Sequence, residues 1–126
     1  MTEPTQALTR TTYGAVFGRV LVEKRHAAQK EQEDMAEALG VSQSTYSRIE
    51  RGHVSVTLEM LARIAELFGE TPASLLQEAD AAAEALQNVG VGVLPDRSPK
   101  SDGDTMLAIL GGAALAALML AALAKK

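Results

Sequence analysis

Two side chains that carry paired hydrogen-bonding groups, Gln43 and Arg48, stand in the short segment 43–50. A glutamine amide and an arginine guanidinium can each form two parallel hydrogen bonds to a planar polar partner. The apolar residues of this segment, Tyr46 and Ile49, are three positions apart and share one face if the segment is a helix. We therefore predict a helix that presents an outward polar strip. The strip comprises Gln43, Ser44, Ser47 and Arg48.

The sequence offers little for catalysis or metal binding. His26 and His53 are the only histidines, and the chain has no cysteine. Neither histidine lies in a recognisable nucleophile, metal or acid–base constellation, and no phosphate-cradling glycine loop is present. We expect no enzyme activity, no cofactor and no metal. The lack of cysteine also suits a reducing compartment.

Five helices are predicted from apolar residues that recur every three or four positions. The first starts near Thr11 or Thr12 and fades between residues 26 and 29, with Val16, Phe17, Val20 and Leu21 on one face. The others are expected at 32–39, 43–50, 57–68 and from 72 to about 88. No convincing strand pair is visible, so the predicted fold class is all-α.

The second and third predicted helices flank a short turn. Gly40 suits a left-handed backbone conformation, and Ser42 suits the N-cap of the third helix. Two short helices around a turn of three to four residues have helix-turn-helix spacing. The fifth helix carries a weak apolar stripe, which either packs on its own domain or contacts a second copy. The stripe comprises Ala79, Ala82, Ala83 and Leu86.

Three stretches in register carry a family resemblance: 32–36 (QEDMA), 40–42 (GVS) and 46–52 (YSRIERG). Over residues 13–76 the chain resembles the Cro/C1-type, or xenobiotic-response-element, helix-turn-helix family. The resemblance implies a domain over 11–88 whose third helix enters the major groove of double-stranded DNA. It further implies a sequence-specific transcriptional regulator that acts as a homodimer or higher homo-oligomer.

The resemblance also implies roles for individual residues. Base contacts are expected from Gln43, Ser44 and Arg48, and phosphate contacts from Gln32, Thr45, Arg51 and His53. Arg25 and Glu50 are expected to form a structural ion pair between the first and third helices. The chain departs from the family pattern at Gln29, Glu31 and Val56, where glycine, serine or threonine, and proline are frequent.

The charge balance gives limited support to DNA binding. The formal net charge is −4, and residues 10–72 carry eight basic and nine acidic side chains. Since DNA-binding domains are usually basic, affinity must come from a local basic patch and from dimerisation.

The residue patterns at the two ends of the chain differ from the amphipathic helices of the domain. Residues 1–10 are expected to be a disordered arm and 89–104 a flexible linker. Residues 106–124 carry no charged side chain and would span about 28 Å as a helix. The segment 105–126 is therefore predicted to be a hydrophobic helix, either a transmembrane anchor or an oligomerisation helix. The N-terminus lacks a signal peptide, so we expect a cytoplasmic domain, tethered to the inner membrane in the first alternative.

A second function stays open at this point. RodZ-like cell-shape proteins join a similar domain to a membrane helix, and their domain docks onto a cytoskeletal filament. The near-neutral charge and the acidic second helix, with Glu33, Asp34 and Glu37, keep a membrane-anchored protein-interaction module as the alternative.

Overall fold

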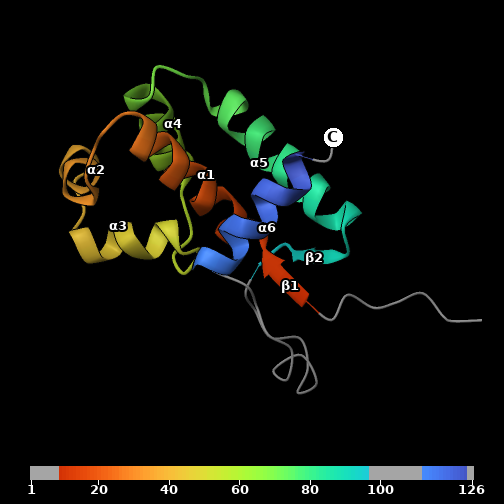
Figure 1. Ribbon diagram of the computed structural model, residues 1–126. Helices are drawn as coiled ribbons and strands as arrows, with labels where there is room; N and C mark the ends of the chain where they lie inside the picture. Colours follow the sequence, from red (N-terminus) through yellow and green to blue (C-terminus); the bar gives the residue numbers. More distant parts are fainter. Residues whose placement is uncertain (1–8, 97–111, 125–126) are drawn as a thin grey trace, which may run out of the picture.

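The computed structural model describes residues 9–96 and 112–124. Five helices form the main body, and a two-stranded sheet and a sixth helix lie against it (Figure 1). The elements in chain order are β1 (Thr9–Thr12), α1 (Tyr13–Ala27), α2 (Gln32–Leu39), α3 (Gln43–Glu50), α4 (Leu58–Leu67), α5 (Pro72–Asn88), β2 (Val91–Leu94) and α6 (Gly112–Ala124). The mainly helical fold confirms the predicted class.

Four of the helices begin at a threonine or serine that caps them. In each case the side-chain oxygen accepts a hydrogen bond from the backbone N–H three residues later, which satisfies a donor that has no partner within the helix. The capping residues are Thr12, Ser42, Thr57 and Thr71. The cap of α3 is a local signal, and the predicted limits of α3 agree with the structure, as do those of α2.

The main hydrophobic core is built from side chains of all five helices from α1 through α5. Tyr46 and Ile49 are buried at its centre, as the spacing in 43–50 predicts. α1 contributes Phe17 and Leu21, and α5 contributes Leu75 and its inner alanines. Burial of these side chains fixes α3 against the rest of the domain and leaves its polar face outside.

A second, smaller core lies on the other side of α1. Val16 and Val20 pack there with Ala82 and Leu86 of α5. The prediction placed the four apolar residues of α1 on one face, but the structure divides them between the two cores. α1 is therefore sandwiched, since apolar surface is buried on both of its sides. The stripe of α5 packs on its own domain, and all four of its residues are buried.

The expectation of no strand pair is wrong. β1 and β2 pair in parallel, with Thr9 opposite Val91 and Thr12 opposite Leu94. Residues 91–94 were predicted as part of a linker, and residues 9–10 as part of the arm. Two strands this short give a weak local signal, and their pairing depends on the helices that bring both chain ends together. Of the other residues predicted as arm and linker, 89–90 and 95–96 flank β2, whereas 1–8 and 97–104 lie outside the described residues.

The hydrophobic segment takes an arrangement that neither alternative anticipated. Its described part, α6, is a helix of 13 residues that packs on α5 and α1. Leu115, Met119 and Ala122 are buried there. Among the described helices, none combines the length and apolar character needed to cross a bilayer. Residues 105–111 and 125–126 of the predicted helix lie outside the described part.

Candidate nucleic-acid interface

The outer face of α3 carries the residues predicted to contact bases. Gln43, Ser44 and Arg48 are all exposed, while Tyr46 and Ile49 anchor the opposite face in the core. α2 and α3 lie together at one end of the molecule, away from the sheet (Figure 1). A short amphipathic helix at an edge can enter a groove without moving the rest of the domain.

Hydroxyl groups are clustered at the start of α3. Ser42 Oγ accepts a hydrogen bond from the Thr45 N–H at 3.1 Å and donates to Thr45 Oγ1 at 3.0 Å. It also lies 3.3 Å from Ser44 Oγ. The Thr45 and Ser44 side chains are thus oriented by the N-cap, which restricts their rotamers before any ligand binds.

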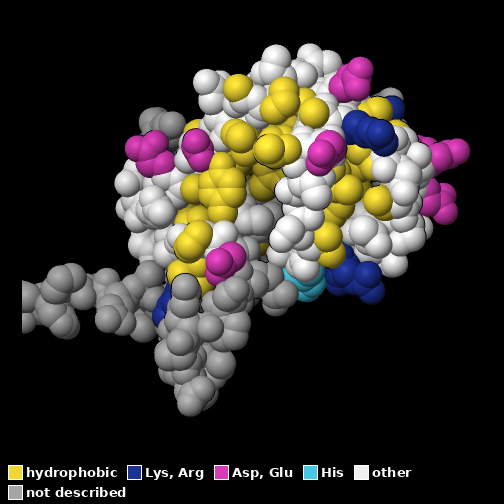
Figure 2. Space-filling view, turned by 180° about the vertical axis from the view of Figure 1, so that it is seen from behind, with side chains coloured by type: hydrophobic (Ala, Val, Ile, Leu, Met, Phe, Trp, Pro, Cys, Tyr) yellow, Lys and Arg dark blue, Asp and Glu magenta, His cyan; other side chains and the backbone are white. Residues whose placement is uncertain are grey.

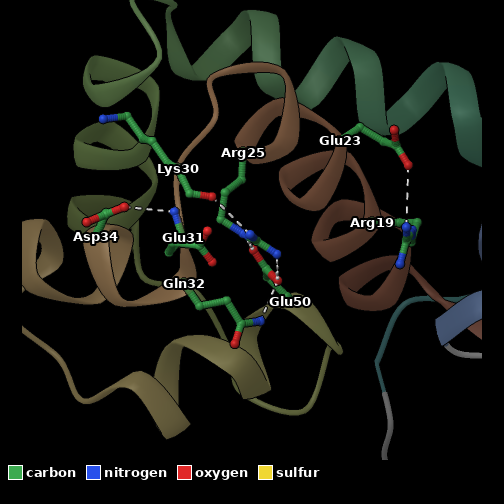
Figure 3. A network of polar contacts seen from close by, with 8 residues as sticks. All are labelled: Arg19, Glu23, Arg25, Lys30, Glu31, Gln32, Asp34 and Glu50. Atoms are coloured by element: carbon green, nitrogen blue, oxygen red, sulfur yellow. Dashed lines mark hydrogen bonds and ion pairs between the residues drawn. The ribbon is translucent and has the colours of Figure 1, made fainter.

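A buried ion pair fastens α3 to α1. The Arg25 guanidinium binds both carboxylate oxygens of Glu50, with Nε–Oε2 at 2.7 Å and Nη2–Oε1 at 3.1 Å (Figure 3). Its Nη1 donates to the carbonyl oxygen of Lys30 at 3.1 Å. The side chains are only 9% and 3% exposed. All three guanidinium nitrogens are therefore engaged, and the loop after α1 is tied into the same network.

Gln32 joins this network from the start of α2. Its amide Nε2 donates to Glu50 Oε1 at 2.8 Å, so α2 and the end of α3 are linked directly (Figure 3). Gln32 was predicted to contact a phosphate. In the described structure its amide nitrogen points to Glu50, which gives it a bridging role that the sequence did not reveal.

The network determines the charge state of Glu50. Burial opposes ionisation of the carboxyl group, but hydrogen bonds from Arg25 and Gln32 outweigh that effect and lower the pKa of Glu50 below its ordinary value. Hydrogen bonds to Glu50 likewise raise the pKa of Arg25. Burial and the nearby Glu50 charge raise the pKa of the Tyr46 phenol. The pair is therefore fully ionised at neutral pH.

The start of α2 is acidic. Glu31 stands at its N-cap, and the Asp34 carboxylate accepts a hydrogen bond from the Glu31 N–H at 2.8 Å. Glu33 adds a third carboxylate in the first turn. These groups compensate the positive end of the helix dipole, and they repel a phosphate that would otherwise bind there.

Two cationic side chains near the interface lie on and just after α3, followed by a histidine. Arg48 and Arg51 are both exposed, and the exposed His53 follows Gly52. The face shown in Figure 2 carries a broad hydrophobic patch with scattered acidic side chains, and a histidine and basic side chains meet at its lower edge.

The comparisons with known proteins agree with this geometry. A helix-turn-helix family model matches residues 23–75. The chain is also similar to the clp gene regulator ClgR from Corynebacterium glutamicum, known from its crystal structure. The identity is 30%, the TM-score is 0.51, and the match covers 70% of this chain and 93% of ClgR. No curated protein matches the sequence significantly.

The chain belongs to the Cro/C1-type helix-turn-helix family.

The departures of this helix-turn-helix domain from the family pattern have visible consequences. Gln29 has a positive φ of 58° after the end of α1, which is a left-handed conformation that favours glycine. Its N–H donates to the His26 carbonyl, and the Lys30 N–H donates to the Arg25 carbonyl, each at 3.0 Å. The end of α1 thus keeps its ordinary hydrogen bonds. The Gln29 backbone, however, adopts a conformation that costs free energy in a residue with a Cβ atom.

Two glycines of the helix-turn-helix core allow backbones to approach closely, which the sequence analysis did not predict. Gly18 of α1 lies against the Glu50 backbone, and Gly52, at φ 77°, lies against the backbone of Gly14 and Ala15. A Cβ atom at either position would overlap backbone atoms. These contacts hold α1 and the end of α3 at short range, which brings Arg25 within reach of Glu50.

Proposed function

We propose that the chain is a sequence-specific double-stranded DNA-binding transcriptional regulator, and that α3 is its recognition helix. The observation that carries the proposal is the exposed polar face of α3, rigidly backed by Tyr46, Ile49 and the Arg25–Glu50 pair. Family membership and the similarity to a gene regulator support it.

In this proposal the base contacts come from Gln43 and Arg48. A glutamine amide matches the donor and acceptor of adenine in the major groove, and an arginine guanidinium matches the two acceptors of guanine. Ser44 adds a short hydroxyl that pairs with any base. These residues determine sequence preference.

Phosphate contacts would position the domain without reading sequence. Thr45, Arg51 and His53 flank the recognition face and are the proposed phosphate ligands. Gln32 is a weaker candidate for a phosphate contact, since its amide nitrogen already donates a hydrogen bond to Glu50. The acidic start of α2 further reduces affinity at that end.

Because one domain offers few cations, a homodimer is part of the proposal. Two recognition helices about 34 Å apart would meet successive major grooves on one side of the duplex. Doubling the contacts compensates for the near-neutral charge of each domain. Analytical ultracentrifugation with and without duplex tests this part. A protein that stays monomeric on bound DNA contradicts it.

A salt series of duplex binding tests the function itself. Fluorescence anisotropy with selected genomic fragments should give an affinity that falls as salt rises, because phosphate neutralisation releases counterions. Arg51→Gln should reduce the salt slope, whereas Arg63→Gln, an exposed substitution on α4, should leave it unchanged. Absence of any complex at low salt contradicts the proposal.

The rival function is a membrane-tethered module that binds another protein. The acidic N-terminus of α2, with Glu31, Glu33 and Asp34, favours it, since such a surface suits a basic protein better than DNA. Tethering would require α6 to leave its groove on α1 and α5. Carbonate extraction of a membrane fraction tests the tether, because an anchored chain stays in the pellet, and the salt series of duplex binding separates the two functions.

A further inference from the structure

Two adjoining hollows lie beside α5. The first, of about 510 Å³, opens between α1, the loop after α3 and α5, and the second, of about 600 Å³, opens between α5 and β2. Tyr13 and Pro95 line both hollows, so the two meet at these residues. We call the combined depression the Tyr13 groove. Hollows of this volume are large enough for a small organic ligand.

One face of α5 runs along the whole Tyr13 groove. Leu76 lines the first hollow, and Asp80 and Glu84 line the second. Because these three residues are four positions apart, they stand on successive turns of the helix, about 6 Å from one to the next. The groove therefore has an apolar end at Leu76 and an acidic end that begins one turn later.

The apolar end keeps surface that a ligand can reach. Val54 and Val56, in the loop after α3, are half-buried, and Leu76 is 37% exposed. The deeper lining residues Phe17 and Leu61 are already buried and form only the floor. Covering the three open side chains would remove apolar surface from water, which favours an apolar body at this end.

The acidic end carries two exposed carboxylates that lack a cationic partner. The Tyr13 phenol donates a hydrogen bond to Asp80 Oδ1 at 2.6 Å, which leaves Oδ2 and the negative charge open to a second partner. Within the described part of the chain, no ion pair joins Asp80 or Glu84 to a cation. Since like charges at i,i+4 repel each other, a cation beside both carboxylates would be stabilised.

The remaining charges of the Tyr13 groove do not change its sign. His53 and Asp96 both line the first hollow, and among the described lining residues there is no lysine or arginine. The excess charge is therefore negative and belongs to Asp80 and Glu84. We propose that the Tyr13 groove binds a small organic cation, with an ammonium group beside Asp80 and Glu84 and an apolar body at the apolar end.

A ligand in the Tyr13 groove would contact the loop that ends the recognition helix. Arg51 is the C-cap of α3, and the residues that follow it, from Gly52 to Val56, line the first hollow. Of the described residues proposed to contact DNA, only His53 is shared with the groove. The site thus goes beyond the proposed function, and it offers a place for an effector next to α3.

Titration of the full chain with 2-phenylethylammonium, in the absence of DNA, tests the proposal by calorimetry and methyl NMR. We expect saturable binding that shifts the methyl signals of Val54, Val56 and Leu76. The affinity should fall as salt rises, because salt screens exposed charges. Since no DNA is present, a negative result leaves the DNA-binding proposal standing.

Charge-removing variants test the acidic end. Asp80→Asn and Glu84→Gln should each weaken binding by about threefold, and the double variant by about tenfold, which is the range of exposed ion pairs. Glu37→Gln, an exposed substitution on α2, lines neither hollow and is the matched control, with an unchanged affinity. Thermal melts establish that each variant is folded. Equal affinities of the double variant and the control contradict the proposal.

Three further ligands separate the ammonium group from the apolar body. 2-Phenylethanol and 3-phenylpropanoate lack the cation, and methylammonium lacks the apolar body, so all three should bind more weakly than 2-phenylethylammonium. Equal affinity for the alcohol overturns the acidic end, and equal affinity for methylammonium overturns the apolar end. If 2-phenylethylammonium does not bind while a lysine-phenylalanine-lysine peptide does, the groove is a docking surface for a protein and the proposal is wrong.

Discussion

Gly18 of α1 lies directly against the backbone carbonyl of Glu50 in α3. A Cβ atom at this position would overlap the carbonyl group, and neither helix backbone can move away cheaply. The closeness of the two helices therefore depends on the absence of a side chain at residue 18.

Gly18→Ala should destabilise the domain by about 1–3 kcal/mol, the usual cost of overpacking a core. Alanine otherwise favours a helix over glycine by about 1 kcal/mol, so a loss of stability reports the clash. Gly14→Ala on the same helix is the control, because its Cβ would meet Gly52 atoms at an ordinary 3.7 Å. Urea unfolding measures both. Equal effects of the two variants would contradict the close contact.

Gln29→Gly should stabilise the domain by about 1 kcal/mol, since glycine adopts the positive φ without the Cβ penalty. Ala28→Gly, one residue earlier, should do the opposite, because Ala28 has an ordinary φ of −87°. Thermal melts of the two variants show whether each substitution raises or lowers the stability of the domain. A destabilised Gln29→Gly variant would mean that the glutamine side chain makes a larger contribution than its backbone costs.

Glu50→Gln should lower the free energy of unfolding by about 3–5 kcal/mol at neutral pH, because it leaves the Arg25 charge buried without its counter-ion. Glu84→Gln, at an exposed site on α5, should change stability by less than about 0.5 kcal/mol. If both variants melt alike, the buried pair does not hold α3 in place.

The pH dependence of stability should follow the lowered pKa of Glu50. In the unfolded chain a glutamate titrates near pH 4.3, and in the folded protein it titrates lower, so folding favours the ionised form. The contribution is fully present above the unfolded pKa and is lost as pH falls through the folded pKa. Denaturant titrations between pH 7 and pH 2.5 should therefore show a fall below about pH 4. Glu50→Gln should flatten this fall, and an unchanged slope would assign it to other carboxylates.

Arg48→Ala should weaken binding to a preferred DNA site by about 1–3 kcal/mol and binding to random duplex by less. The reason is that a guanidinium in the groove reads a base as well as adding charge. Competition anisotropy with both duplexes measures the difference. Equal losses on the two duplexes would make Arg48 a phosphate ligand.

Leu115→Ala should destabilise the protein by about 2–4 kcal/mol, since its side chain fills the core between α1, α5 and α6. Leu120→Ala, 65% exposed on the same helix, should have little effect. Chemical unfolding of the full chain compares them. If neither variant changes stability, α6 does not contribute to the folded domain.

The amino-acid sequence by itself determined the elements that depend on neighbouring residues. Ser42 and Thr71 mark helix starts, Gly40 marks a turn, and the spacing of Tyr46 and Ile49 selects the buried face of α3. Each of these signals acts over a few residues, through capping hydrogen bonds or helical periodicity, so a reader of the sequence can follow it directly.

Only the tertiary structure decided which distant groups meet. β1 pairs with β2 because the two ends of the domain are brought side by side, and Val16 turns to α6 while Phe17 faces α3. The Gln32–Glu50 hydrogen bond has the same origin. Such contacts depend on shape and packing between segments far apart in the chain, and no local pattern encodes them.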